Sequence, residues 1–286
     1  MKQRLYLNAI LLAVVSVLGL FLYFSPGKVD DQEPPLLIDL SKDSVDRIRI
    51  EHDGEPVISL KRQGQTWHLL EPYQVAADSD RISLLLDFLQ ARSVTRFPSA
   101  SENLASYGLD HPGSVLTIND QRFEFGAQHP LKAARYVQFG DTVHLVADIV
   151  TQHLTAGAEA YVNPNLIEPG SKITGIEVPG LKVSQENNAL TASDPSASTD
   201  EIAGYIERWR SARAIDIRRA TDKDRSTVTT ETVQIKDGFG KSLTFTVLTR
   251  TPTLQLLRPD MGLVYEVPIE LSESLLQLKP AQAASP

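Results

Sequence analysis

An almost unbroken apolar segment, residues 5–24, precedes everything else of note in the chain. At a rise of about 1.5 Å per residue, a helix of roughly twenty residues reaches about 30 Å, the thickness of the hydrocarbon core of a bilayer. Asn8 and Ser16 are its only strongly polar interruptions. The sequence therefore predicts a transmembrane helix within an N-terminal tip and anchor of residues 1–29.

The charges that flank this segment predict its orientation. Lys2 and Arg4 precede it, whereas Asp30 and Asp31 soon follow it. Because basic residues concentrate on the cytoplasmic side, we expect the N-terminus inside and the bulk of the chain outside. The alternative is a cleaved signal peptide, which would have a shorter apolar region and a small-x-small cleavage site. The bulky residues 21–26 favour an uncleaved anchor.

Composition excludes several classes of function. The chain has no cysteine, which removes disulfides, thiol catalysis and cysteine-ligated metals. The formal net charge is −8, and all 36 acidic residues lie beyond residue 29. Binding to nucleic acid requires a basic surface, so this charge balance opposes a nucleic-acid partner.

Beyond the anchor, one pattern of strands and a helix occurs twice. In the first copy, alternating or β-rich stretches at 45–50, 57–62 and 66–70 precede an amphipathic helix that Asp78 or Ser79 can cap. In the second, stretches at 173–178, 181–183 and 189–191 precede a helix that Thr199 can cap. The two helices have apolar stripes 120 residues apart, formed by Ile82, Leu85, Leu86 and Leu89 and by Ile202, Tyr205, Ile206 and Trp209.

The second half of each copy is mainly β. The first has strand patterns at 93–97, 115–118, 121–125, 135–139 and 143–146, and the second has them at 231–235, 242–248, 254–257 and 263–267. Short helices are expected at 149–156 and 272–278. We predict an α+β protein with a stalk at 30–40, related modules at 41–166 and 167–279, each a mainly antiparallel sheet packed with a helix, and a disordered tail at 280–286. Trp67 and the eight stripe residues are expected in the core.

Several short motifs in the first module resemble the bacterial family known as domain of unknown function 4340. They are Trp67-His68-Leu69, Glu71-Pro72, Ala77-Asp78, Leu84-Leu85-Leu86, Phe125-Gly126, Arg135-Tyr136-Val137, Val143-His144-Leu145-Val146 and the segment from Leu104 to Pro112. The resemblance covers about residues 40–165 well, and the second module only as a diverged echo. It implies a membrane-anchored envelope protein, in some members associated with ABC-type export or gliding motility. It supplies no catalytic residues.

The most specific of these motifs is Tyr-Gly-Leu-Asp-x-Pro. It comprises Tyr107, Gly108, Leu109, Asp110 and Pro112. Gly108 can adopt a positive φ and Pro112 restricts the chain that leads into the next strand, so a structural corner explains the motif. Contact with a partner is the alternative, and only the first module would make it.

No residue pattern points to catalysis, a metal or a cofactor. The six histidines include no pair at the i, i+4 spacing of a zinc protease, and His68 and His144 are expected to face outward from strands. Helix capping explains Asp78 and Asp80, and a hairpin turn explains the glycine-rich residues 238–241 better than a phosphate loop does. We therefore expect no catalytic, cofactor-binding or metal-binding residues.

The anchor, the repeated module and the missing chemistry together predict a non-catalytic subunit. It would be a single-pass protein of the bacterial inner membrane, with its bulk in the periplasm, that docks onto envelope machinery such as an ABC-type transport or gliding-like system. The alternatives are an envelope hydrolase with a site between the modules, and a sensor of a small ligand in an apolar pocket.

Overall fold

The computed structural model describes residues 2–24, 33–168, 170–186, 189–227 and 231–278. Contacts divide the chain into two units between Pro35 and Leu36. The first unit contains helix α1, Lys2–Phe24, over the apolar segment. Within the described residues, no helix meets the combined length and hydropathy of a bilayer span. The anchor therefore stays a prediction, and the expected tail at 280–286 lies outside the described residues.

The first module is built on a nine-stranded sheet in the order β4-β3-β2-β1-β6-β7-β8-β9-β5, in which all neighbours are antiparallel. Its strands are β1 (Arg47–His52), β2 (Ile58–Gln63), β3 (Thr66–Glu71), β4 (Val75–Ala76), β5 (Thr95–Pro98), β6 (Ser114–Ile118), β7 (Gln121–Gln128), β8 (Ala134–Phe139) and β9 (Thr142–Ala147). In β1, Ile48 and Ile50 are buried while Arg47 and Arg49 are exposed, as alternation in a half-buried strand requires.

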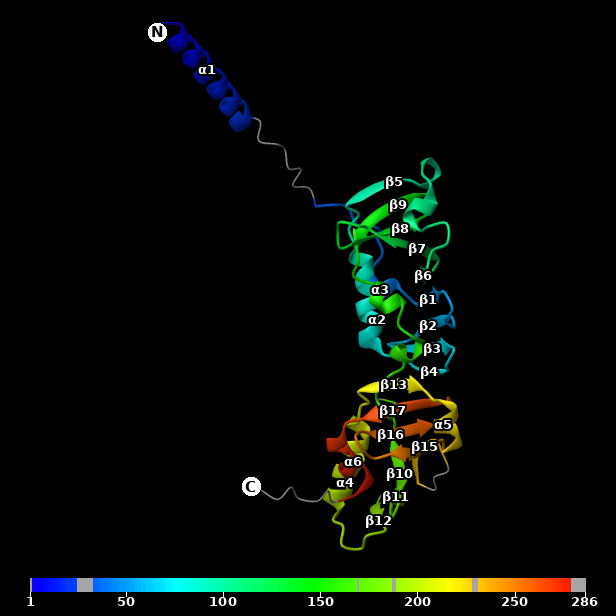
Figure 1. Ribbon diagram of the computed structural model, residues 1–286. Helices are drawn as coiled ribbons and strands as arrows, with labels where there is room; N and C mark the ends of the chain where they lie inside the picture. The colour runs from blue at the N-terminus through cyan, green and yellow to red at the C-terminus, as the bar shows by residue number, and fades with distance from the viewer. Residues whose placement is uncertain (1, 25–32, 169, 187–188, 228–230, 279–286) are drawn as a thin grey trace. The chain divides into compact units, whose positions relative to one another are not determined.

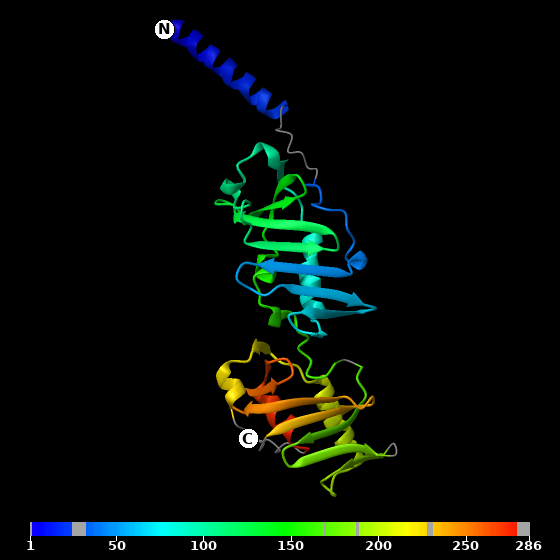
Figure 2. The same cartoon turned by 90° about the vertical axis from the view of Figure 1, so that its right-hand side faces the viewer.

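Among its described residues, the second module repeats this strand order without a counterpart of β4. Its eight strands follow the order β12-β11-β10-β14-β15-β16-β17-β13. They are β10 (Ile173–Val178), β11 (Leu181–Glu186), β12 (Ala189–Ala192), β13 (Asp216–Arg219), β14 (Thr232–Asp237), β15 (Ser242–Thr249), β16 (Leu254–Arg258) and β17 (Leu263–Val267). In both modules the chain builds one side of the sheet, crosses a face through a helix to the far edge, and then fills the gap with four strands (Figures 1 and 2). Two similar sheet modules therefore support the predicted internal repeat.

Each crossing helix begins at a side-chain cap. Asp78 caps α2 (Ser79–Leu86) by accepting the backbone N–H groups of Asp80 and Arg81. Ser198, one residue before the expected Thr199, caps α4 (Thr199–Ser211) in a reciprocal capping box with Glu201. The first helix tightens into the 3-10 helix η2 (Asp87–Gln90), so its stripe extends beyond the α-helical segment.

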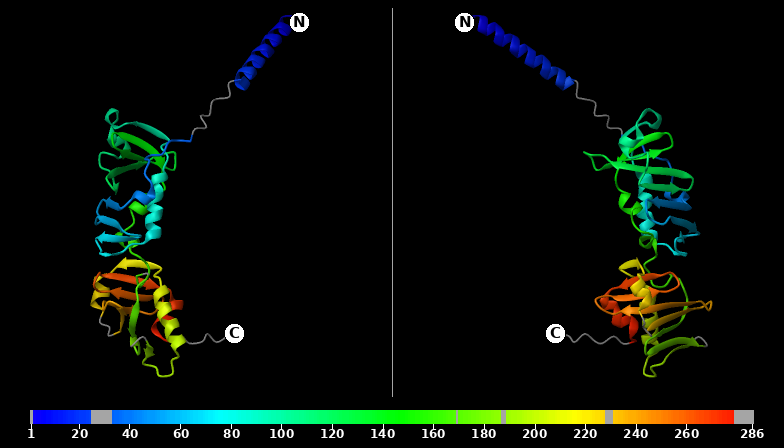
Figure 3. Two further views of the ribbon diagram at one scale, coloured as in Figure 1. Left: turned by 180° about the vertical axis from the view of Figure 1, so that it is seen from behind. Right: turned by 45° about the vertical axis from the view of Figure 1, so that its right-hand side comes forward.

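The stripes of both helices lie in the core. Trp67 and all eight stripe residues are buried, as is Phe88, whose ring lies 5.1 Å from that of Phe123. In the second module, Tyr205 Oη and Trp209 Nε1 both donate to the carbonyl oxygen of Leu275, at 2.7 and 3.0 Å. This carbonyl belongs to α6 (Ile269–Leu276), which lies beside α4 (Figure 3). The helical stripe thus joins both the sheet and the closing helix.

The remaining elements refine the expected boundaries. The first module closes with α3 (Thr151–Leu154) and the 3-10 helix η5 (Ala158–Tyr161), and further 3-10 helices are η1 (Lys42–Ser44), η3 (Ser99–Ser101) and η4 (Leu104–Tyr107). The sequence predicts a polar loop at 219–230, but this segment contains helix α5 (Asp222–Ser226). Within the expected stalk, Leu37 is buried and its N–H donates to the carbonyl oxygen of Ala91 at 2.8 Å. The described part of that stalk therefore includes residues that pack on the first module.

Candidate functional site

The two modules meet at a connector, residues 162–168, that is hydrogen-bonded to both of them. The N–H of Asn163 donates to the carbonyl oxygen of Ala76 in β4, at 3.0 Å. Three residues later, the N–H of Leu166 donates to the carbonyl oxygen of Ala212, at the end of α4, at 3.1 Å. Because each bond fixes a short segment of backbone, the connector is part of the folded structure on both sides.

A cavity of about 370 Å³ lies beside this connector. Residues of β2, β3, β4, β10, β14, β15, β16 and β17 line it together with the connector. Its apolar lining includes Leu166, Ile167, Ile173, Ile235, Leu243 and Tyr265. Its polar lining includes four amide side chains, Gln63, Gln74, Asn163 and Asn165, and the charged residues Glu168, Lys236, Asp237, Lys241 and Arg258. A cavity of this size and mixed lining can accommodate a small polar molecule.

Several polar groups of the cavity serve local structure. Asp237 accepts the backbone N–H groups of Phe239 and Lys241, at 2.9 and 2.8 Å, within the β14–β15 hairpin. Arg258 donates from Nε to Asp260 at 3.2 Å. Among the described residues, no group of three or more histidine, aspartate or glutamate side chains has the geometry to hold a metal ion. The cavity thus offers polar groups that can form hydrogen bonds with a ligand, whereas Asp237 and Arg258 already stabilise turns.

A carboxylate held from both modules lies at a second point of the junction. Glu159 in η5 accepts a hydrogen bond from Tyr73 Oη at 2.5 Å and from Arg219 Nε, at the end of β13, at 3.1 Å. Burial acts to raise the pKa of Glu159, but the hydrogen bonds from Tyr73 and Arg219 and the charge of Arg219 lower it overall. Burial and the hydrogen bond to Glu159 raise the pKa of Tyr73. This trio joins the modules while Glu159 is ionised.

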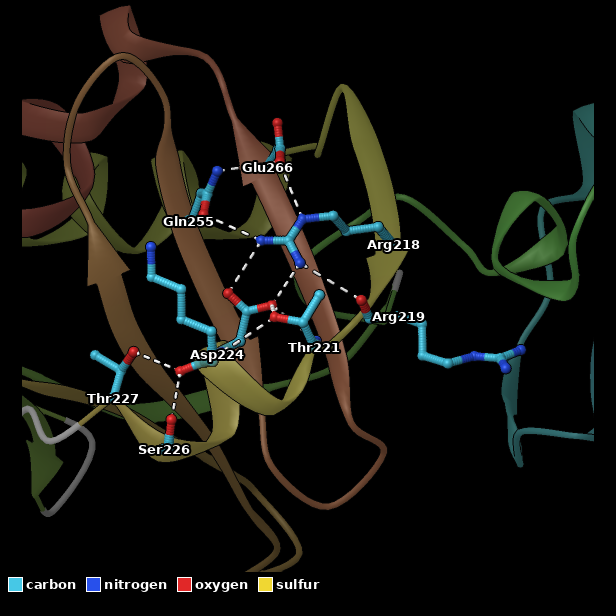
Figure 4. Close-up of polar contacts among 9 residues, drawn as sticks. Arg218, Arg219, Thr221, Asp224, Ser226, Thr227, Gln255 and Glu266 are labelled. Atoms are coloured by element: carbon cyan, nitrogen blue, oxygen red, sulfur yellow. Dashed lines mark hydrogen bonds and ion pairs between the residues drawn. The ribbon is translucent and has the colours of Figure 1, made fainter.

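A denser ionic network covers the outer face of the second sheet, and Figure 4 shows its geometry. Arg218 donates from Nη1 to Asp224 at 2.6 Å, from Nη2 to Gln255 at 3.2 Å, and from Nε to Glu266 at 3.4 Å. The hydrogen bonds from Arg218 are the main reason that the pKa of Asp224 lies far below its usual value. Arg219 extends away from this network, toward Glu159. The network therefore attaches α5 to the sheet.

The Tyr-Gly-Leu-Asp-x-Pro motif lies elsewhere, on the outer face of the first sheet. Gly108 ends η4 at φ 65°, in the left-handed region that favours glycine. Leu109 is buried, and the ring of Tyr107 lies 4.7 Å from that of Tyr136 and 5.2 Å from that of Phe97. Asp110 is exposed. The motif thus forms a corner that covers the first sheet, and it contributes no residue to the connector.

Equivalent positions of the two sheets have different chemistry. Phe97 on β5 and Tyr136 on β8 pair with positions of β9 that are two residues apart. Arg218 on β13 and Gln255 on β16 pair with positions of β17 that have the same spacing. The aromatic pair lies under η4, whereas the arginine and glutamine lie under α5. The motif therefore has a positional counterpart in the second module, but its contacts are ionic there.

Two histidines contact serines, and in one of them the direction of the hydrogen bonds is fixed. His52 Nδ1 lies 2.7 Å from the carbonyl oxygen of Gly113 and 2.8 Å from Ser114 Oγ. A carbonyl oxygen only accepts, so Nδ1 carries the proton and cannot remove one from the serine. General-base activation of Ser114 by this nitrogen is thereby excluded.

His144 does not face outward as expected, because it is buried in β9. Its Nδ1 lies 2.9 Å from Ser93 Oγ, which itself donates to the carbonyl oxygen of Thr95 at 3.2 Å. The hydroxyl proton is thus engaged, and Nδ1 donates to the oxygen. Burial, assisted by the charge of Arg96, lowers the pKa of His144. The neutral imidazole fixes the backbone at the edge strand β5.

The residues that join the modules carried no clear signal in the sequence. Glu159 and Arg219 are sixty residues apart, and neither belongs to a motif. By contrast, Thr221 and Asp224 have the spacing of a capping box, which was a readable sign of α5 within the segment interpreted as a loop.

Comparison with known proteins identifies one family. The family model described as a domain of unknown function, DUF4340, matches residues 67–237. This match runs from β3 of the first module through the connector to the end of β14 in the second, so it begins later than the expected residues 40–165 and ends well beyond them. No curated protein and no solved structure matches the chain.

Proposed function

The chain belongs to the DUF4340 family, and we propose that it is a non-catalytic docking or accessory subunit of bacterial envelope machinery. In this proposal the apolar segment anchors the protein in the inner membrane, the two modules lie in the periplasm, and the machinery is an ABC-type transport or gliding-like system. The family supplies no activity, so the proposal rests on the features of this chain.

The open edges of the two sheets carry the docking proposal. Strands β5 and β12 each end a sheet, with no further strand beside them among the described residues. The outer N–H and carbonyl groups of an edge strand can pair with an extended segment of another chain. Two such edges on one polypeptide suit a protein whose role is to bind other proteins.

The arrangement of polar groups supports a non-catalytic role. The serine–histidine contacts at Ser114 and Ser93 place a donating nitrogen toward each hydroxyl, and Glu159 is ionised between Tyr73 and Arg219. The serine–histidine contacts lie within the first module, and Glu159, the carboxylate at the junction, is held by structural partners, which argues against a hydrolase there.

The proposed location rests on the sequence. The apolar segment at 5–24 has the length of a bilayer span, and the charges beside it favour a cytoplasmic N-terminus. Protease treatment of spheroplasts tests this directly. We expect a tag at the C-terminus to be digested from outside, and protection of that tag would contradict the proposed orientation.

Crosslinking in intact cells tests the docking role. Cells that express the tagged full chain are treated with a membrane-permeable crosslinker and solubilised in mild detergent. We expect a defined complex with an integral membrane component of transport or motility machinery. Recovery of the monomer alone, at crosslinker levels that capture a known envelope complex, would overturn the proposal.

The cavity at the connector favours one other candidate, a sensor of a small polar ligand. It has about 370 Å³ of space and a lining rich in amide side chains. A thermal-shift screen of polar metabolites against Asn165→Leu and the unchanged protein would separate the two functions. A ligand that raises the unfolding temperature of the unchanged protein alone would favour sensing.

A further inference from the structure

We propose that the outer edge of β12 binds an extended, uncharged segment of a partner protein, which joins the second sheet as a ninth antiparallel strand. This inference rests on the proposed docking role and names the surface and the kind of partner. Its basis is the comparison of the two modules within this chain.

The first module already contains such a strand at the equivalent edge. There, β4 lies antiparallel to β3, with Ala76 opposite His68 and Val75 opposite Leu69. The N–H of Ala77 continues this pairing by donating to the carbonyl oxygen of Trp67 at 2.8 Å. In the second module the order ends at β12, the counterpart of β3. The repeat thus shows what kind of element fits on this edge.

The register of the strands defines which residues are equivalent. Ile48 faces Leu60 across β1 and β2, and Leu60 faces Leu69 on β3. In the second module, Ile176 faces Val183, which faces Ala192 on β12. By the same alternation, the counterpart of Trp67 is Leu190.

The core at this edge is less covered in the second module. Trp67 is 5% exposed and Leu69 is 0% exposed. Their counterparts, Leu190 and Ala192, are only half-buried, although both pack against the hydrophobic core. Val75 of β4 also packs against the core in the first module. A strand added beside β12 would therefore bury apolar surface as well as form backbone hydrogen bonds.

The backbone of β12 presents unpaired positions at suitable places. The N–H of Ser193 donates to the carbonyl oxygen of Lys182 on β11. Because bonded positions alternate along an antiparallel strand, the N–H groups of Leu190 and Ala192 point away from β11. Carbonyl oxygens of the partner segment would accept hydrogen bonds from these N–H groups.

The chemistry of β12 indicates an uncharged partner. Its residues, Ala189–Ala192, include no charge and no proline, the devices with which proteins commonly protect an exposed edge. The other outer edge, β5, has both, in Arg96 and Pro98. The strand that fits, judged from Val75 and Ala76, has a small or β-branched apolar residue facing the core. About four residues suffice, since β12 is four residues long.

The absence of cysteine makes the test direct, because one introduced cysteine is the only thiol of this chain. Thr191 is exposed on β12, and Thr95 is exposed on β5 as a matched control. Thr191→Cys and Thr95→Cys are placed in the full chain in its native membrane and labelled with a benzophenone maleimide. After irradiation, the crosslinked peptides are mapped by mass spectrometry. We expect an adduct from position 191 to an extended, uncharged segment of another envelope protein, and much less from position 95.

Two edge variants then test whether strand pairing causes the adduct. Ala192→Pro removes an outward N–H, and Ala189→Lys adds a charge on the exposed side of β12 without removing a backbone donor. We expect Ala192→Pro to reduce the adduct about fivefold, as the loss of one hydrogen bond implies, and Ala189→Lys to reduce it because a charge at the edge opposes pairing with an uncharged strand. Circular dichroism reports whether each variant folds, and Ala189→Lys carries the test if Ala192→Pro does not.

Each other outcome overturns the inference. An adduct within the same chain to residues 279–286 would identify its own C-terminal segment as the occupant, and an adduct to position 191 of a second copy would identify self-association. An adduct unaffected by both variants would show contact without strand pairing. If whole-cell crosslinking captures a partner while position 191 does not react, the docking role stands and this site is wrong.

Discussion

Gly126→Ala is expected to destabilise the first module strongly, because another part of the backbone occupies the space for a side chain. A Cβ at position 126 would lie 2.3 Å from the carbonyl oxygen of Tyr107 and 2.8 Å from Cγ of Leu109. The carbonyl cannot move easily, since the next turn is fixed by Gly108 in the left-handed region and by a hydrogen bond from the N–H of Leu109 to Leu104 at 3.0 Å.

The magnitude follows from this lack of room. Overpacking in a well-packed region costs about 1–3 kcal/mol, and a clash with fixed backbone belongs at the upper end, about 3 kcal/mol. For a folded unit of this size, 1 kcal/mol shifts the unfolding temperature by about 2–4 °C, so the expected decrease is about 6–12 °C. Thermal unfolding of the full chain in mild detergent, followed by circular dichroism, measures it.

Gly113→Ala is the matched control in the same corner. Nothing lies within 4 Å of a Cβ at Gly113, and its φ is not in the left-handed region. Alanine there is expected to be neutral or to stabilise by about 0.4–1 kcal/mol, because it restricts the unfolded chain. Equal unfolding temperatures for the Gly126→Ala variant and the unchanged protein would refute the structural interpretation of the motif.

Two further predictions concern the junction and the second core. Glu159→Gln should lower the free energy of unfolding by only about 0.5–1 kcal/mol near neutral pH, since Arg219 is half exposed. Because the folded-state pKa of Glu159 is lowered, its contribution to stability is present above the unfolded-state pKa and is lost as the pH falls through the folded-state pKa. The urea midpoints of the variant and the unchanged protein should therefore converge in acid. Convergence at neutral pH instead would show that the ion pair contributes nothing. Tyr205→Phe should lower the free energy of unfolding by about 1 kcal/mol, because the carbonyl oxygen of Leu275 keeps its hydrogen bond from Trp209. Trp209→Ala should lower it by about 3–5 kcal/mol, since a large buried side chain is lost. Equal urea midpoints for the two variants would contradict this ranking.

The repeated architecture was predictable because local patterns determine it. The apolar spacing in residues 82–89 and 202–209 identified the buried helix faces, and alternation located most strands to within one or two residues. The order of strands in the sheets follows from pairing between distant segments, so alternation alone did not specify it. The two-residue strand β4 is too short to leave a periodic pattern.

The errors occurred where the chain is covered on two sides or held by distant partners. His144 was expected to face solvent, but β9 has the core on one side and the layer formed by Phe97 and Tyr136 on the other, so alternation gave the wrong environment. The contact between Glu159 and Arg219 depends on the arrangement of two modules, and no local pattern encodes it.

The position of β5 and β13 at the margins of their sheets has a consequence for how the polypeptide matures. Among the described strands, each pairs only with the last strand of its own module, as Thr95 does with Leu145 and Asp216 with Glu266, a separation of about fifty residues. Such distant pairing is slow, and it cannot form until the final strand of the module has been synthesised. During that interval the sheet of each nascent module is incomplete, and its unpaired strand edges are exposed to misassembly before the module reaches its native form.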